Sequence, residues 1–208
     1  MLDINNVVIG YGGHALVVIE SYLSNGGRLG YYTDNIEKAS NPFNLIYLGS
    51  ESDIDFKGWQ MPVNFILGIG DNRLRENVAN LILNQRKNIE NVIDSNSIVS
   101  KSVSLGHGLF ISKGVLVNAL SKIGNFVILN TGCIIEHECE IDTAVHIAPG
   151  AVLAGNVKIG KRSFIGANSV IKQGVTIGKD VIIGAGSVII NNVADNSRIV
   201  GNPGRDIK

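Results

Sequence analysis

Two histidines, nine residues apart, carry the clearest chemical signal in the chain. His137 is followed directly by Glu138, and His146 comes later in the segment VHI. An imidazole with its ordinary pKa is mostly neutral near pH 7, and an adjacent carboxylate can orient the ring and raise its basicity. The His137 and Glu138 pair therefore predicts a general base that removes a proton from an amine or hydroxyl nucleophile.

A second chemical signal is a glycine-rich loop near the N-terminus. Gly10, Gly12 and Ala15 satisfy the pattern G-x-G-x-x-G/A, and Asp34 follows the next expected strand, where an acid can hold a ribose hydroxyl. About 90 residues are too few for the paired halves that hold a whole dinucleotide. The loop therefore predicts a mononucleotide diphosphate bound at a helix N-terminus. A strand–helix turn without a ligand is the alternative.

The elements that position the two histidines belong to a six-residue repeat. Every sixth residue from Ile93 to Ile189 is Leu, Ile or Val, and the residue two positions earlier is mostly small or β-branched. This period is typical of a β-solenoid, in which each hexapeptide forms one short strand and a corner and the aliphatic side chain points inward. Glycine, asparagine or an acid follows many of the inward residues, as tight bends require.

The repeat also predicts where the two histidines lie. Three hexapeptides make one coil of 18 residues, so His137 falls at a corner and His146, beside inward Ile147, points outward from a flat side. Nine residues are half a coil, which puts the two rings on opposed sides of one prism. They can share a site only between subunits, and we expect a homotrimer with intersubunit active sites.

The residues before the solenoid predict half of a nucleotide-binding sheet. Hydrophobic patterning favours strands at 4–9, 29–33 and 65–68 and helices at 15–23 and 73–85. We therefore expect an αβ domain over 1–92, a β-helix over 93–190 and a C-terminal tail over 191–208.

Composition narrows the classes of partner. The 18 basic and 18 acidic residues cancel, and no apolar run is long enough to cross a membrane, so we expect neither nucleic acid nor membrane insertion. The N-terminus lacks a secretory leader pattern, which favours a cytoplasmic protein. Cys133 and Cys139 lack the spacing of a zinc or redox site and are expected to be reduced core residues.

The run IIEHECEIDTAVHIAPGAVLAGNVKIGKRSFIGANSVIKQGVTIGKDVIIGAGSVI resembles the hexapeptide-repeat acyltransferases. With VVIGYGGHALVVIESYL and FILGIGDNRLRENV, it looks more narrowly like the NeuD-type sugar O- and N-acetyltransferases, nearest to those that acetylate UDP-4-amino sugars for bacillosamine. The resemblance implies a Rossmann-like half domain, a left-handed parallel β-helix, a homotrimer and acetyl-CoA as cosubstrate, with no metal.

The resemblance also assigns roles to individual positions. It makes His137 the catalytic base and Glu138 its partner. The implied nucleotide-sugar contacts are Gly12, Gly13, His14, Asp34, Asn35 and Gly70. The implied acetyl-CoA contacts are His146, Ala167 and Ala185. Asn35 departs from the second aspartate that is often found at its position.

The activity implied is N-acetylation of the 4-amino group of a UDP- or dTDP-linked 4-amino-4,6-dideoxy sugar, by direct attack on the thioester, for a bacterial surface glycan. A sialic acid O-acetyltransferase, a zinc enzyme of the carbonic-anhydrase type and a non-enzymatic scaffold or ligand sensor remain alternatives. A zinc site needs three converging ligands. The spacings between His107, His137 and His146 are not multiples of 18, so these histidines do not stack on successive coils.

Overall fold

A four-stranded parallel sheet forms the N-terminal part of the protein in the computed structural model, which describes residues 6–207. Its strand order is β3-β2-β1-β4, with β1 (Asn6–Ile9), β2 (Leu29–Thr33), β3 (Ile46–Tyr47) and β4 (Phe65–Leu67). The helices are α1 (Gly13–Ser24), η1 (Lys57–Gln60) and α2 (Asn72–Asn84). The first two residues of the expected strand at 4–9 lie outside the described residues. Neither β3 nor η1 was expected, because both are too short to show a period.

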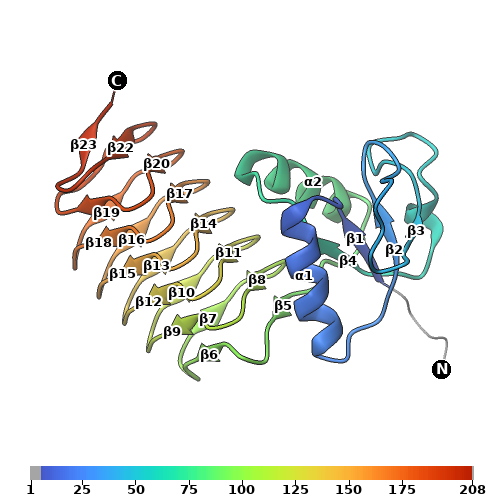
Figure 1. Cartoon of the computed structure of the whole chain (residues 1–208), viewed down its shortest axis with the longest axis horizontal. Coiled ribbons are helices and arrows are strands. Elements are labelled where there is room, and N and C mark those ends of the chain that lie inside the picture. The colour runs from blue at the N-terminus through green and yellow to red at the C-terminus, as the bar shows by residue number, and fades with distance from the viewer. Residues whose placement is uncertain (1–5, 208) are drawn as a thin grey trace.

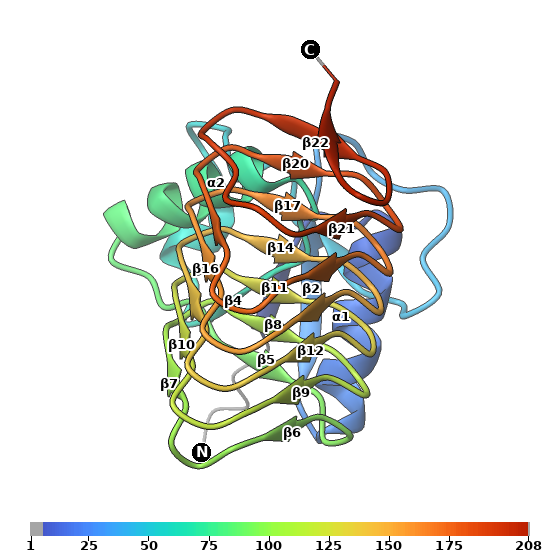
Figure 2. The ribbon, with the colours of Figure 1, turned by 90° about the vertical axis from the view of Figure 1, so that its left-hand side faces the viewer.

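The rest of the chain winds into a left-handed parallel β-helix, and the predicted fold class is confirmed (Figure 1). From Val92 to Ile189, paired residues of neighbouring strands are 18 positions apart, so Ile128 lies beside His146 and Ile134 beside Val152. Figure 2 shows the short strands of successive coils stacked one above another. This stacking produces three flat faces.

The face covered by the N-terminal domain, called the covered face, comprises β5 (Val92–Ile93), β8 (Phe110–Ile111), β11 (Ile128–Leu129), β14 (His146–Ile147), β17 (Phe164–Ile165), β20 (Ile182–Ile183), β22 (Arg198–Val200) and β23 (Arg205–Asp206). The aliphatic face comprises β6 (Ile98–Val99), β9 (Leu116–Val117), β12 (Ile134–Ile135), β15 (Val152–Leu153), β18 (Val170–Ile171) and β21 (Val188–Ile189). The charged face comprises β7 (Ser104–Leu105), β10 (Lys122–Ile123), β13 (Glu140–Ile141), β16 (Lys158–Ile159) and β19 (Thr176–Ile177). The segment 191–208 was expected to be a tail. It includes β22, which pairs in parallel with β20 and so extends the covered face.

The core of the solenoid consists of the predicted inward residues. Leu129, Ile147 and Ile165 are each fully buried and follow one another along the stack. The corners need glycine where coils approach closely: a Cβ on Gly160 would lie 2.6 Å from the backbone carbon of Gly178 on the next coil. Both cysteines are free and buried, as expected.

The N-terminal domain docks against the covered face through α1 and α2 (Figure 1). Val18 of α1 and Ile66 of β4 pack in one buried cluster with the outward residues Phe110 and Ile128. Burial of such apolar area is the main driving force for domain docking. Within residues 6–207, no helix combines the length and hydrophobicity that a membrane crossing requires.

Candidate active site

The predicted base lies at the corner between the aliphatic and charged faces. Both side chains are accessible: that of His137 is 49% exposed and that of Glu138 is 58% exposed. His137 Nδ1 lies 3.1 Å from Glu138 Oε2. When Nδ1–H donates to the carboxylate, the neutral ring keeps Nε2 as a proton acceptor.

Glu138 occupies a corner position with a left-handed backbone. Its φ is +60°, and the equivalent positions on neighbouring coils, Leu120, Asn156 and Gly174, also have positive φ. A residue with a Cβ pays about 1–2 kcal/mol in this conformation, whereas glycine does not. This strain is common to the corners of the solenoid, and the feature that distinguishes Glu138 is its carboxylate next to His137 Nδ1.

Gly155, one coil above, supports the His137 ring. A Cβ at Gly155 would lie 2.5 Å from His137 Nε2, so the absence of a side chain there lets the imidazole lie against the backbone. Any larger residue would push the ring out of its place.

A second histidine pair forms where the two domains meet. His146 projects from the covered face, as its register predicts, but only 9% of it is exposed because the N-terminal domain lies over it. Its ring centroid is 6.0 Å from that of His14, and its Nε2 lies 3.1 Å from Asn130 Nδ2. The amide donates, so Nε2 accepts and the ring is neutral. Gly70 packs on His14, where an added Cβ would be 3.7 Å from His14 Cβ.

Both rings of this pair are poor bases. Burial, together with the positive charge of Arg75, lowers the pKa of His14 to about 4. Burial also lowers the pKa of His146 to about 3, again with Arg75 contributing. His14 Nε2 and His146 Nδ1 are buried without a hydrogen bond of good geometry, although the Gly70 backbone acts on His146. Both rings are therefore neutral near pH 7.

The predicted nucleotide loop borders open space. A Cβ built on Gly12 or Gly13 would meet no atom within 4 Å. Asp34 lies nearby, and its carboxylate accepts from Tyr11 N at 3.0 Å and pairs with Lys38 at 3.0 Å. Burial tends to raise the pKa of Asp34, but these partners and Asn35 N lower it on balance. The carboxylate is ionised and already ties the glycine loop to the end of β2.

The predicted cofactor contacts Ala167 and Ala185 lie at the corner between the covered and aliphatic faces, on consecutive coils. Gly186 N donates to Ala167 O across these coils. This edge is opposite the His137 corner across the aliphatic face, so one chain does not bring the two together. It does bring together His14, Gly70 and His146.

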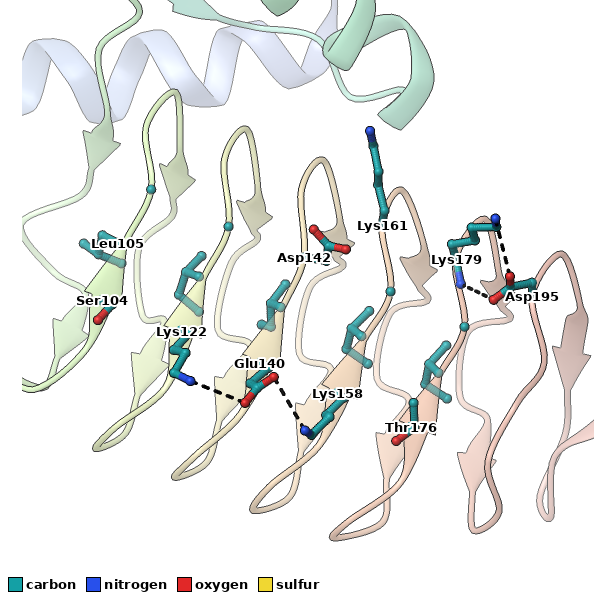
Figure 3. Close-up of a pocket in the computed structure, with 18 residues that line it drawn as sticks. Ser104, Leu105, Lys122, Glu140, Asp142, Lys158, Lys161, Thr176, Lys179 and Asp195 are labelled. Carbon is teal, nitrogen blue, oxygen red and sulfur yellow. Dashed lines mark hydrogen bonds and ion pairs between the residues drawn. The ribbon is translucent and has the colours of Figure 1, made fainter.

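The charged face is hollowed into an open groove of about 830 Å³. Figure 3 shows Lys122 and Lys158 pointing to Glu140 from either side, with Nζ–Oε distances of 3.5 and 3.6 Å. These three side chains are about half exposed and their ion pairs are long, so the two ion pairs contribute little to the stability of the fold.

The structure also separates the three solenoid histidines. His107 lies at an exposed corner with its ring against Phe126, away from both His137 and His146. Among residues 6–207, no cluster of three or more His, Cys, Asp or Glu side chains has the arrangement of a metal site.

No role was assigned to Arg75 from the sequence, although it lies near the site. The hydrophobic pattern puts it within the expected helix at 73–85. In the structure the residue is only 1% exposed and contacts both domains. The signal was present: it shares the i, i+3, i+4, i+7 spacing of the buried face with Val78, Ala79 and Ile82.

The buried histidine pair makes stability depend on pH. Both pKa values are depressed, so the unfolded chain binds protons that the folded chain does not as the pH falls below about 6.5. We expect the free energy of unfolding, measured with urea, to be about 2 kcal/mol lower at pH 5 than at pH 7 for each histidine. His14→Gln with His146→Gln should flatten this profile, whereas the exposed control His107→Gln should not. An unchanged slope in the double variant would contradict the assignment.

Comparisons with known proteins identify the family. Residues 5–82 match the PglD N-terminal domain and residues 156–190 match the hexapeptide repeat of succinyl-transferase. No curated protein sequence matches the chain significantly.

Among solved structures, PerB from Caulobacter crescentus, in complex with CoA and GDP-perosamine, is 35% identical, with a TM-score of 0.92 over 98% of this chain and 97% of that one. The acetyltransferase domain of PglB from Neisseria gonorrhoeae, in complex with acetyl coenzyme A, is 29% identical, with a TM-score of 0.91 over 98% of both chains. By these matches, the chain belongs to the NeuD/PglD family of hexapeptide-repeat sugar acetyltransferases.

Proposed function

We propose that this protein transfers the acetyl group of acetyl-CoA to the amino group of a nucleotide-linked amino sugar. The observation that carries the proposal is the accessible His137, with Glu138 on Nδ1 and Nε2 left free. Family membership supports the donor and the acceptor class, because relatives bind CoA with GDP-perosamine or acetyl coenzyme A alone.

His137 acts as the general base in this proposal. Its Nε2 takes a proton from the sugar amine as the nitrogen attacks the thioester carbonyl, and Glu138 stabilises the imidazolium that forms. The new C–N bond replaces the C–S bond when the tetrahedral intermediate collapses. The proton then passes from the imidazolium to the CoA thiolate, which leaves as the thiol.

The nucleotide part of the acceptor binds the N-terminal domain. Gly12 and Gly13 leave open space at the N-terminus of α1, where the helix dipole and free N–H groups favour a diphosphate. Neutral His14 and the Gly70 backbone lie beside it, toward the solenoid. We propose that the acceptor is a 4-amino-4,6-dideoxy sugar linked to UDP or dTDP. Because PerB binds GDP-perosamine, GDP is a further candidate for the nucleotide.

We infer a homotrimer, and the aliphatic face supports it. Its outward residues form an unbroken apolar stripe across six strands: Ile98, Leu116, Ile134, Val152, Val170 and Val188. Ile98 is 68% exposed and Val170 is 40% exposed, whereas the corresponding residues of the charged face are Ser, Lys, Glu, Lys and Thr. A contiguous exposed apolar face of this kind marks a protein interface.

Ring closure then explains the separation of the site residues. When three prisms present the aliphatic face to a common axis, one edge of that face lies beside the opposite edge of the next subunit. The first edge carries His137, and the other carries Ala167 and Ala185. We propose that the thioester lies between these edges, so that each active site needs two subunits.

Removal of the base should abolish most turnover. Thiol release from acetyl-CoA, assayed with UDP-, dTDP- and GDP-linked 4-amino sugars, should fall about 10²- to 10⁴-fold in His137→Ala. His107→Ala, at another exposed corner, should retain normal rates. Near-native turnover in His137→Ala would overturn the assignment of the base. If only free or CMP-linked sialic acid were acetylated, the acceptor group would be a hydroxyl and not an amine.

Glycine in place of Glu138 should separate stability from catalysis. Glu138→Gly removes the cost of a Cβ at φ +60°, so we expect the melting temperature to stay level or rise. The same change removes the partner of His137 Nδ1, and kcat should drop at least about tenfold. Asn156→Gly, at the equivalent corner one coil on, tests the backbone effect alone. A Glu138→Gly enzyme with native kcat would show that the carboxylate has no catalytic part.

A charge on the aliphatic face should dissociate the trimer. Val152→Arg places a guanidinium in the middle of the stripe, where burial without a partner costs several kcal/mol. Light scattering should show monomers, with thiol release lost because each site needs two subunits. Thr176→Arg on the charged face is the matched control and should stay trimeric. A Val152→Arg protein that remains trimeric would exclude this face as the interface.

A further inference from the structure

The buried guanidinium of Arg75 has no carboxylate among its hydrogen-bond partners. Its Nε donates to Phe126 O at 2.8 Å, and its Nη1 donates to Gly70 O at 2.9 Å and Ile69 O at 3.2 Å. Its Nη2 donates to Asn72 Oδ1 at 2.9 Å, Ala144 O at 3.0 Å and Val145 O at 3.3 Å. All the acceptors are uncharged.

The acids nearest to Arg75 serve other groups. Asp71 caps α2 by accepting from Leu74 N at 2.8 Å, and Glu76 forms ion pairs with Lys161 and Arg162. Burial lowers the pKa of Arg75 to about 9, so it remains charged near neutral pH. A buried charge whose nearest carboxylates bind other groups costs several kcal/mol, which its six uncharged acceptors and the through-space attraction of Asp71 and Glu76 offset only in part. An apolar side chain would fill a domain interface at lower cost.

Besides Asn72 on its own helix, the acceptors of Arg75 come from one loop of the N-terminal domain and from two consecutive coils of the solenoid. Ile69 and Gly70 belong to the loop between β4 and α2, where Gly70 packs on His14. Phe126 lies at a corner of one coil. Ala144 and Val145 lie on the next coil and lead directly into His146.

We propose that Arg75 is a positioning residue, which holds Gly70, His14 and His146 in one fixed arrangement for the nucleotide sugar and the acetyl donor. This inference rests on the proposed function for its ligands, but its geometry does not. The planar fork of arginine reaches all three segments at once, which a lysine ammonium cannot do. Burial keeps both imidazoles neutral, and the charge of Arg75 adds to this effect because it disfavours a second positive charge on either ring.

The charges acting on the two rings are few. Arg75 acts on both His14 and His146, and His14 acts on His146. Burial accounts for the larger part of each effect, and it stays in place when Arg75 changes. The contribution of Arg75 is therefore measurable by substitution.

Two substitutions separate the fork from the charge. Arg75→Lys keeps the charge and loses the planar guanidinium, whereas Arg75→Met keeps an unbranched apolar stem and loses both the charge and the guanidinium. Arg73→Met is the matched control, because the neighbouring Arg73 side chain is 70% exposed and pairs with Asp180. Each purified full-length protein is titrated by histidine-detected NMR, and KM for the nucleotide sugar and for acetyl-CoA is measured beside kcat.

The expected result has two parts. Arg75→Met should raise the titration midpoints of His14 and His146 by about 1 pH unit, whereas Arg75→Lys should leave them near native values but alter both ring chemical shifts. Both variants should raise KM for the nucleotide sugar about 10- to 100-fold, with a smaller change in kcat. Arg73→Met should change none of these.

A purely structural role predicts a different outcome. Arg75→Lys and Arg75→Met would then lower the melting temperature but leave the ring signals and KM of the folded protein unchanged, which would overturn the proposal. Arg75→Lys decides the case if Arg75→Met does not fold. Failure of the wild-type enzyme to acetylate any nucleotide sugar would overturn the proposed function instead. The NMR titration, read without substrate, would still decide whether Arg75 positions the histidines.

Discussion

The whole solenoid depends on the in-register stacking of one aliphatic residue over the next, 18 residues apart. Leu129, Ile147 and Ile165 are buried because the strands that carry them pair in parallel along one face. Each coil lacks enough apolar surface to be stable alone, so a coil is stable only between its neighbours. Because this stacking fixes the register, it also fixes which face every outward residue occupies.

That fixed register lets a single repeat build three different surfaces. The inward positions hold one kind of residue throughout, while the outward positions differ from face to face. Aromatic and aliphatic residues with His146 lie under the N-terminal domain, aliphatic residues form a free stripe, and ions alternate in the groove of Figure 3. The corners between the faces hold the chemical groups, because a corner residue is exposed while its backbone is held by two coils.

The contact between the domains has both apolar and polar parts. Along α1, Val18 packs on Phe110 and Ile128, which stabilises docking without fixing its exact position. Along α2, Arg75 and Glu76 bind specific groups at the corners of the solenoid. Directional hydrogen bonds from a rigid guanidinium specify position where apolar packing alone does not. The buried histidine pair lies where such precision is needed.

The sequence by itself determined the solenoid, the strand–helix order of the N-terminal domain and the exposed corner position of His137 beside Glu138. These features depend on short-range periodicity and on neighbours in the chain, which a single sequence displays. Only the tertiary structure decided that His146 is covered by the N-terminal domain, that it meets His14, and that Arg75 lies buried between the domains. Those contacts join residues about 50 to 130 positions apart across a docking surface, and the orientation of that surface is set by side-chain packing rather than by any period.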